Sequence, residues 1–149
     1  MKSLYVLSGA TGMTGSELIH QLLELEPESK IIGFDNFFAS SIDTIKPYLN
    51  NKNITFYEYD LNNEEQMVAI EKEVNAVKAD YERVVYINCA AVVHTEHFYH
   101  VESTFQTNVI SMGYFLEQAI RVGADSYINC STSEVYSMQS WNEDGGVKE

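Results

Sequence analysis

The sequence predicts an α/β fold built on a doubly wound parallel sheet with the strand order 3-2-1-4-5. Three observations lead to this prediction. Short apolar runs alternate with helix-patterned segments along the 149 residues, the first run ends in a glycine-rich turn, and polar residues follow the ends of later runs. Alternating strands and helices form parallel sheets with right-handed crossovers, so we expect helices on both faces of the sheet.

Five strands are expected from runs that are rich in apolar and β-branched residues. The first is apolar almost throughout, as is usual for a strand covered on both faces. The third mixes Tyr, Thr and Glu with apolar residues, which suits the edge of a sheet. In chain order the predicted strands span residues 3–8, 30–35, 54–60, 83–89 and 126–131.

Helical segments are expected between these strands. Pro27 ends the first one, because proline does not continue a helix. Asn63 is a predicted N-cap, with Gln66 at the reciprocal position of a capping box. Gly123 is the expected stop of the last helix. The predicted helices span residues 12–25, 42–49, 63–79 and 101–122.

Three glycines, Gly9, Gly12 and Gly15, join the first strand to the first helix. Gly9 allows a sharp turn, Gly12 has no side chain to keep a phosphate from the backbone, and Gly15 allows close packing of the helix on the strand. The spacing differs from Gly-x-Gly-x-x-Gly, so its place after the first strand carries the prediction. The N–H groups of the first helical turn and the helix dipole favour an anion there.

Two carboxylates end the second and third predicted strands. Asp35, twenty residues after Gly15, can accept hydrogen bonds from both ribose hydroxyls of an adenosine and would repel a 2′-phosphate. Asp60 could receive the adenine amino group while Leu61 packs on the ring. The competing interpretations are a turn residue for Asp35 and an acidic residue before a helix cap for Asp60.

Small and hydroxyl-bearing residues follow the fourth and fifth strands. The run Cys89, Ala90 and Ala91 would let a flat cofactor approach the backbone, or would serve close packing alone. The segment 131–136 could hydrogen-bond a substrate oxygen through a hydroxyl, and Glu134 could act as acid or base. The competing interpretation is a Ser/Thr turn. A third class, a phosphate-binding hydrolase, lacks a nucleophile–base pair.

Three histidines, His94, His97 and His100, recur at intervals of three residues after the fourth strand. Metal ligands recur at such intervals, but helical pairs are more usually spaced by four. We therefore expect no metal site. The alternative is a polar loop over the crevice, in which His94 and Thr95 contact substrate.

Composition excludes several classes of partner. The net charge of −13 argues against binding to nucleic acid or anionic membranes. No apolar run approaches the roughly 20 residues of a membrane span, and no secretory signal precedes the first strand. The two cysteines, Cys89 and Cys130, are interpreted as buried free thiols in a reducing compartment, so a cytoplasmic location is expected.

Taken together, the motifs resemble the extended short-chain dehydrogenases/reductases, and among them the nucleotide-sugar epimerase and dehydratase branch. This resemblance covers essentially the whole chain and implies a Rossmann-like fold with NAD as cofactor. It matches Asn108 to the residue that orders the site from the long helix, and Thr132 to the catalytic Ser/Thr. The implied cofactor-binding residues are Gly9, Thr11, Gly12, Met13, Thr14, Gly15, Asp35, Asn36, Asp60, Leu61, Cys89, Ala90, Ala91 and Asn108.

The resemblance implies a transient hydride transfer between a sugar hydroxyl and NAD, with Thr132 and Glu134 as the catalytic residues. Sugar 4,6-dehydratases carry Asp-Glu directly after this Thr, whereas this chain has Ser133 before Glu134. That departure favours epimerisation or simple redox chemistry on a nucleotide sugar. The alternatives are a 4,6-dehydratase and, from a different class, a non-catalytic NAD sensor or scaffold.

The family's Tyr-x-x-x-Lys motif does not occur after Thr132. We therefore expect residues 1–136 to form the NAD-binding domain, truncated before the last strands and the substrate domain, with 137–149 as a polar tail. On this reading the chain alone is inactive. The resemblance also implies a homodimer through the helix at 101–122, and Phe105, Met112 and Leu116 are expected to be partly exposed there.

Overall fold

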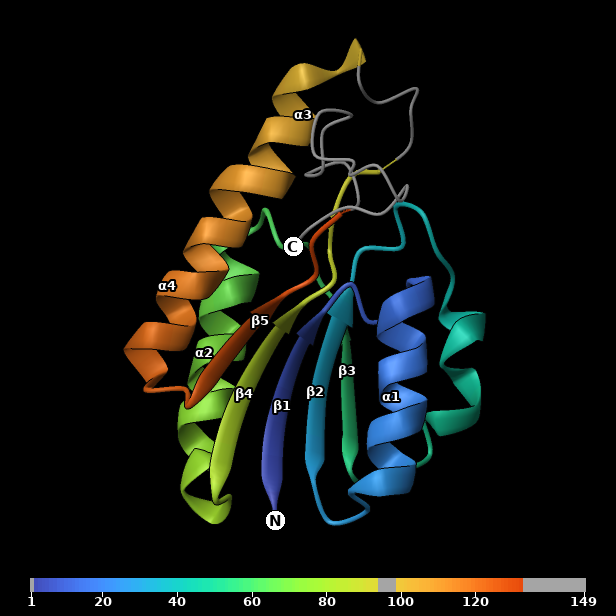
Figure 1. The fold of residues 1–149 in the computed structure, drawn as a ribbon, viewed down its shortest axis with the longest axis vertical. Helices are drawn as coiled ribbons and strands as arrows, with labels where there is room; N and C mark the ends of the chain where they lie inside the picture. The colour runs from blue at the N-terminus through green and yellow to red at the C-terminus, as the bar shows by residue number, and fades with distance from the viewer. Residues whose placement is uncertain (1, 94–98, 133–149) are drawn as a thin grey trace, which may run out of the picture.

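The computed structural model describes residues 2–93 and 99–132. They form one five-stranded parallel sheet with the order β3-β2-β1-β4-β5 (Figure 1), which confirms the predicted fold class and strand order. The strands are β1 (Ser3–Ser8), β2 (Lys30–Asp35), β3 (Ile54–Glu58), β4 (Arg83–Asn88) and β5 (Ser126–Asn129).

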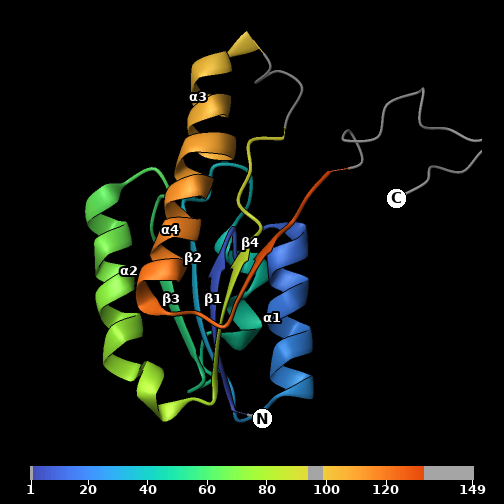
Figure 2. The same ribbon diagram turned by 60° about the vertical axis from the view of Figure 1, so that its left-hand side comes forward.

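Helices cover the sheet on both faces (Figures 1 and 2). One face carries α1 (Met13–Leu25) together with two 3₁₀ turns, η1 (Ile42–Thr44) and η2 (Lys46–Tyr48). On the other face lie α2 (Glu64–Val77), followed by the 3₁₀ turn η3 (Lys78–Asp80), and a long helix. This long helix consists of α3 (Val101–Phe105), the π-helical segment η5 (Gln106–Ser111) and α4 (Met112–Val122).

Two apolar cores hold these layers together, because side chains alternate between the faces of each strand. On the α2 and α4 side, Phe34 and Tyr86 pack around Phe115 of α4, with ring centroids 5.6 and 4.9 Å from it. On the α1 side, Leu7 and Ile87 pack with Ile19 of α1. Both faces of β1 and β4 are thereby buried, as their apolar sequence predicts.

Several predicted boundaries differ from the observed ones. The third strand ends at Glu58 rather than Asp60, because the Asp60 N–H donates to the Gln66 side chain (2.7 Å) instead of to a neighbouring strand. This contact also replaces the second half of the predicted capping box, whereas the Asn63 cap itself forms with the Gln66 N–H (3.1 Å). The predicted helix 42–49 is two 3₁₀ turns, since Pro47 lacks an N–H.

The long helix ends as predicted at Gly123, which adopts φ 72°. Its π-helical segment was not predicted. The side chains of Phe105 and Leu116 are 53% and 37% exposed and Met112 is half-buried, as expected for this face. Within residues 2–93 and 99–132, no helix combines the length and the apolar character needed to cross a membrane.

Candidate functional site

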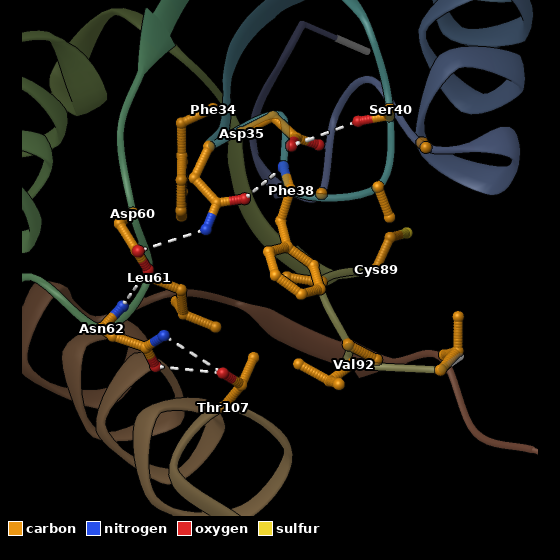
Figure 3. A pocket seen from close by; sticks show the side chains of 18 of the residues that line it. Phe34, Asp35, Phe38, Ser40, Asp60, Leu61, Asn62, Cys89, Val92 and Thr107 are labelled. Carbon is orange, nitrogen blue, oxygen red and sulfur yellow. Dashed lines mark hydrogen bonds between the residues drawn. The ribbon is translucent and has the colours of Figure 1, made fainter. Parts of the chain in front are cut away.

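A pocket of about 630 Å³ lies at the carboxyl ends of the strands, where the order of the sheet reverses between β1 and β4. Ligands of open α/β sheets bind at such a switch point. Loops that follow four of the strands supply its wall, together with the start of the long helix (Figure 3). Most of its lining residues are apolar or small, and the charged ones are Asp35 and Asp60.

The glycine turn forms one wall of the pocket. Gly9 adopts φ +67°, and a Cβ atom there would lie 2.6 Å from the Ala90 nitrogen. A Cβ on Gly15 would lie 2.1 Å from the Gly9 carbonyl oxygen, so the helix packs on the turn itself. In contrast, a Cβ on Gly12 would meet protein only at 3.4 Å, and its φ of −65° suits any residue. The fold therefore requires Gly9 and Gly15, whereas the space beside Gly12 is open to a ligand.

The first turn of α1 faces this space without a competing anion. All of α1 is described, and its first turn holds no acidic residue and no side-chain cap from Gly12. A helix N-terminus of this kind attracts a phosphate through its N–H groups and its dipole. Met13 and Thr14, which open the helix, both line the pocket.

Asp35 orders the loop that follows β2. One carboxylate oxygen accepts from the Thr11 N–H (3.1 Å), and the other accepts from the Phe37 N–H (2.9 Å) and the Ser40 hydroxyl (3.3 Å). Phe37 adopts φ 58°, a conformation uncommon for a bulky residue and often found at functional sites. A carboxylate has about four lone-pair positions, so Asp35 retains acceptor capacity toward a ligand.

Asp60 connects the loops after β2 and β3. Its carboxylate accepts from the Asn36 side chain (3.1 Å) and from the Asn62 N–H (2.8 Å). The Asn36 oxygen in turn accepts from the Phe38 N–H (3.0 Å), which places the Phe38 ring at the pocket (Figure 3). Leu61 is buried beside this network, with 7% of its surface exposed.

Asn108 secures the loop that follows β4. Its side-chain oxygen accepts from the Val92 N–H (2.7 Å), and its amide group donates to the Val92 carbonyl (3.0 Å). Asn108 lies in the π-helical segment, and such segments occur frequently at functional sites. Next to it, Thr107 bonds the Asn62 side chain, so the same segment also supports the loop after β3.

Twelve of the fourteen residues predicted to contact a cofactor line this one pocket. The other two lie behind the wall: Thr11 is fully buried, with its hydroxyl 2.6 Å from that of Ser40, and Asn108 makes the contacts to Val92 described above. The lining members of the predicted set are Gly9, Gly12, Met13, Thr14, Gly15, Asp35, Asn36, Asp60, Leu61, Cys89, Ala90 and Ala91.

Of the residues predicted to face the substrate, only Thr132 lies within the described part of the chain. Thr132 is exposed, lies beyond the end of β5 and is not among the described residues that line the pocket. His94, Thr95, His97 and Glu134 lie outside the described residues. In the described ranges no three His, Cys, Asp or Glu side chains gather in a way that could hold a metal ion.

Ten of the lining residues were missed in the sequence, and four of them take part in the contacts of the loops after β2 and β3: Phe38, Ser40, Asn62 and Thr107. Asn62 could have been found, because it follows the third strand on the same rim as Asp60. The other three lie in loops or on the long helix, where no periodic pattern signals a pocket. The interpretation of both cysteines as buried was wrong for Cys130, which is exposed after the edge strand, and Cys89 is only half-buried.

The model of the NAD dependent epimerase/dehydratase family matches residues 5–145 of the chain. The match includes most of β1, the other four strands of the described sheet and all the described loops that line the pocket. It begins within β1 and runs past the end of β5.

Individual proteins resemble the chain over nearly its full length. It is 29% identical over 131 residues to UDP-glucuronic acid decarboxylase 5 of Arabidopsis thaliana, covering 88% of this chain and 34% of that protein. It is 29% identical over 147 residues to dTDP-glucose 4,6-dehydratase of Streptomyces antibioticus, covering 93% of this chain and 41% of that one.

The fold resembles a solved structure of dTDP-glucose 4,6-dehydratase from Bacillus anthracis in complex with NAD. The TM-score is 0.73 at 23% sequence identity, and the alignment covers 99% of this chain and 44% of that one. The chain therefore spans less than half the length of each of these three proteins.

Proposed function

Because the chain belongs to the NAD dependent epimerase/dehydratase family, we propose that its pocket binds NAD and that it is the cofactor-binding part of an enzyme for nucleotide sugars. The observation that carries the proposal is the single pocket shared by the glycine turn, Asp35 and Asp60. Its volume of about 630 Å³ is within the range of cofactor sites.

The residues present fit the pyrophosphate and the adenosine part of NAD. The open space beside Gly12 and the first turn of α1 would hold the pyrophosphate. Asp35 would accept a hydrogen bond from a ribose hydroxyl at its remaining acceptor position, while Asp60 and Leu61 would contact the adenine. When bound, NAD supplies the acceptor for a hydride from a sugar carbon, so that an alcohol becomes a ketone.

Two of the relatives support a nucleotide sugar as the substrate class. The names of both refer to a sugar joined to a nucleoside diphosphate, UDP-glucuronic acid in one and dTDP-glucose in the other. We propose a reaction of this class in which a sugar hydroxyl is transiently oxidised. Epimerisation is our leading assignment on the Ser133–Glu134 sequence, with 4,6-dehydration as the alternative that the dehydratase relative supports.

Thr132 and Glu134 are our candidates for the residues that face the sugar. Thr132 is exposed beyond β5, outside the described pocket wall, which suits a contact with substrate rather than with the dinucleotide. The variant Thr132→Val should therefore leave the NAD dissociation constant within about twofold of wild type, a change of roughly 0.4 kcal/mol. A much larger loss of NAD affinity would assign Thr132 to the cofactor site.

Gly12 gives a direct test of cofactor binding by calorimetric titration. In Gly12→Ala the added methyl has room in the free protein but occupies the space proposed for the pyrophosphate. NAD affinity should fall about tenfold or more, equivalent to roughly 1.4 kcal/mol. The matched control is Gly113→Ala, where the added methyl meets no atom within 4 Å and lies outside the pocket. Equal NAD binding by both variants would contradict the proposal.

We further propose that these 149 residues do not turn over a nucleotide sugar by themselves. No Tyr-x-x-x-Lys follows Thr132, and in the resembled family this Tyr is the base that takes the hydroxyl proton. A hydride-transfer assay with NAD and a panel of UDP- and dTDP-sugars tests this. Measurable turnover would show that another residue serves as the base.

The exposed face of the long helix supports a homodimer as a further part of the proposal. Val101 and Phe105 lie four residues apart at the start of this helix, and Leu116 and Ile120 lie four residues apart near its end; all four are 37–71% exposed. Ile120→Glu should shift the chain toward monomer in light scattering. Leu25→Glu, on an exposed residue of α1 on the opposite face, is the control. A wild-type chain that stays monomeric at high concentration would rule out this dimer.

A further inference from the structure

Two cysteines meet at the carboxyl ends of β4 and β5. Cys89 directly follows β4 and Cys130 directly follows β5, and their Sγ atoms lie 3.4 Å apart. Both are free thiols, and they are the two cysteines of the 149-residue sequence. Any disulfide within one chain must therefore join these two residues.

The backbone holds the two cysteines side by side. Asn88 pairs with Asn129 in the register of the sheet, so the next residue of each strand follows in register. The Cys89 N–H donates to the Ser8 carbonyl (3.1 Å), and the Cys130 N–H donates to the Asn88 carbonyl (2.9 Å). These bonds extend the hydrogen-bond ladder of the sheet on both sides of Cys89 and fix the backbone of both cysteines.

This spacing is compatible with a covalent bond. Neighbouring strands lie about 4.8 Å apart, and disulfides join Cα atoms about 4.4–6.8 Å apart. The Sγ atoms need to close from 3.4 Å to the bond length of about 2.05 Å, which side-chain rotation can supply.

We propose that Cys89 and Cys130 form a reversible disulfide by exchange with a small-molecule disulfide such as glutathione disulfide. The proposal goes beyond the proposed function and does not depend on it. Cys89 lines the pocket and Cys130 lies two residues before Thr132. Forming or breaking this disulfide would therefore change the wall of the pocket, close to Thr132, which we propose faces the sugar.

The exposed thiol reacts first, because the small molecule must reach it. The Cys130 thiolate bonds to one glutathione sulfur, the glutathione S–S bond breaks, and one glutathione thiolate leaves. The Cys89 thiolate then bonds to the Cys130 sulfur and displaces the second glutathione. Two protein thiols are oxidised, one glutathione disulfide is reduced to two thiols, and the two protein protons pass to the leaving thiolates.

The environment of Cys89 suits it to the second step. Burial, followed by the contact with Cys130, raises the pKa of Cys89 to about 12. A thiol with so high a pKa is a poor first nucleophile at neutral pH. In the mixed disulfide its target sulfur is already adjacent, so proximity compensates for the small thiolate fraction.

Equilibration in a glutathione redox buffer tests the proposal on the purified 149-residue chain. Reactions are stopped with acid, and mass spectrometry separates the dithiol, the mixed disulfide and the internal disulfide. The same equilibrium is measured in concentrated urea, where the fold no longer holds the thiols together. Because a native-like disulfide and the native fold stabilise each other, the equilibrium constant should be about tenfold or more larger in the folded chain.

The single variants Cys89→Ser and Cys130→Ser control for the assignment. Each should give at most a mixed disulfide with glutathione, and Cys130→Ser should form it more slowly because its remaining thiol is the less exposed one. An equilibrium constant in the folded chain equal to or below that in urea would overturn the proposal. So would a folded chain that stops at the mixed disulfide or forms disulfides only between chains.

Discussion

The side chain of Asn108 pairs with the backbone of Val92 through two hydrogen bonds: the Val92 N–H donates to Asn108 Oδ1 (2.7 Å), and Asn108 Nδ2 donates to the Val92 carbonyl (3.0 Å). A side chain on the long helix thus acts as a pairing partner for the loop after β4, beyond the end of the ladder that joins β4 and β5 in the described residues. The contact fixes the loop that closes the pocket beside Ala91 and Val92.

Asn108→Ala should release this loop without unfolding the sheet. Two hydrogen bonds are lost, each contributing about 1 kcal/mol, so hydrogen exchange at the Val92 N–H should accelerate about tenfold or more. The control is Asn62→Ala, which removes a different side-chain contact to the same π-helical segment. Unchanged exchange at Val92 in Asn108→Ala would show that the loop is held by other contacts.

A substitution at Gly15 tests whether close packing of α1 on the glycine turn requires glycine there. A Cβ at this position would lie 2.1 Å from the Gly9 carbonyl oxygen, a backbone atom that cannot move without shifting the turn. Gly15→Ala should lower the free energy of unfolding by roughly 3 kcal/mol, as severe overpacking does. Urea denaturation followed by circular dichroism measures it.

The control for Gly15 is again Gly113→Ala. An alanine in the open space of a helix should raise the free energy of unfolding by about 0.5–1 kcal/mol. If both substitutions had similar effects, the close approach of α1 to the turn would not be the reason for glycine at position 15.

Ionic strength tests how an anionic ligand is held. The chain carries a net charge of −13, and none of the described residues lining the pocket is Lys or Arg. Backbone N–H groups, rather than cationic side chains, would hold the pyrophosphate. Raising the salt concentration from about 20 to about 200 mM screens the repulsion, so NAD affinity should stay constant or rise. A fall of several-fold would indicate a cationic contact.

Residues at the ends of the strands could be predicted from the sequence, because their positions depend only on the apolar pattern and on the order of the strands. Gly9, Asp35, Asp60, Ala90 and Ser131 were expected on one rim because each lies at or just past the end of a strand of a parallel sheet. The structure brings the first four to one pocket, whereas Ser131 is not among the described residues that line it. This inference needs only the fold class and the ends of the runs.

Contacts between distant polar side chains were not predictable in this way. The bond between Thr107 and Asn62 joins residues 45 positions apart, and no periodicity signals it. The π-helical segment also escaped prediction, because residues 101–122 were interpreted as one continuous helix. Ser40 was missed for the same reason, since its bonds to Asp35 and Thr11 form only once β1 and β2 are side by side.

Asp35→Asn should alter cofactor choice by removing the negative charge while keeping the shape of the side chain. The repulsion of a 2′-phosphate is lost, so the ratio of NADP to NAD affinity should rise about tenfold or more, or roughly 1.4 kcal/mol. Ser40→Ala is the control, because it removes one hydrogen bond to Asp35 and retains the carboxylate. Calorimetric titration of each variant with both cofactors provides the ratio, and an unchanged ratio in Asp35→Asn would remove Asp35 from cofactor selection.

We propose that the pocket at the carboxyl ends of the strands binds NAD and that Asp35 makes it prefer NAD to NADP. Calorimetric titration of the unmodified chain with NAD and with NADP tests this claim most directly. We predict one NAD site per chain and a dissociation constant for NADP that is about tenfold or more higher, because the 2′-phosphate would lie against the Asp35 carboxylate. NADP binding as tight as or tighter than NAD binding, or no binding of NAD at millimolar concentration, would contradict it.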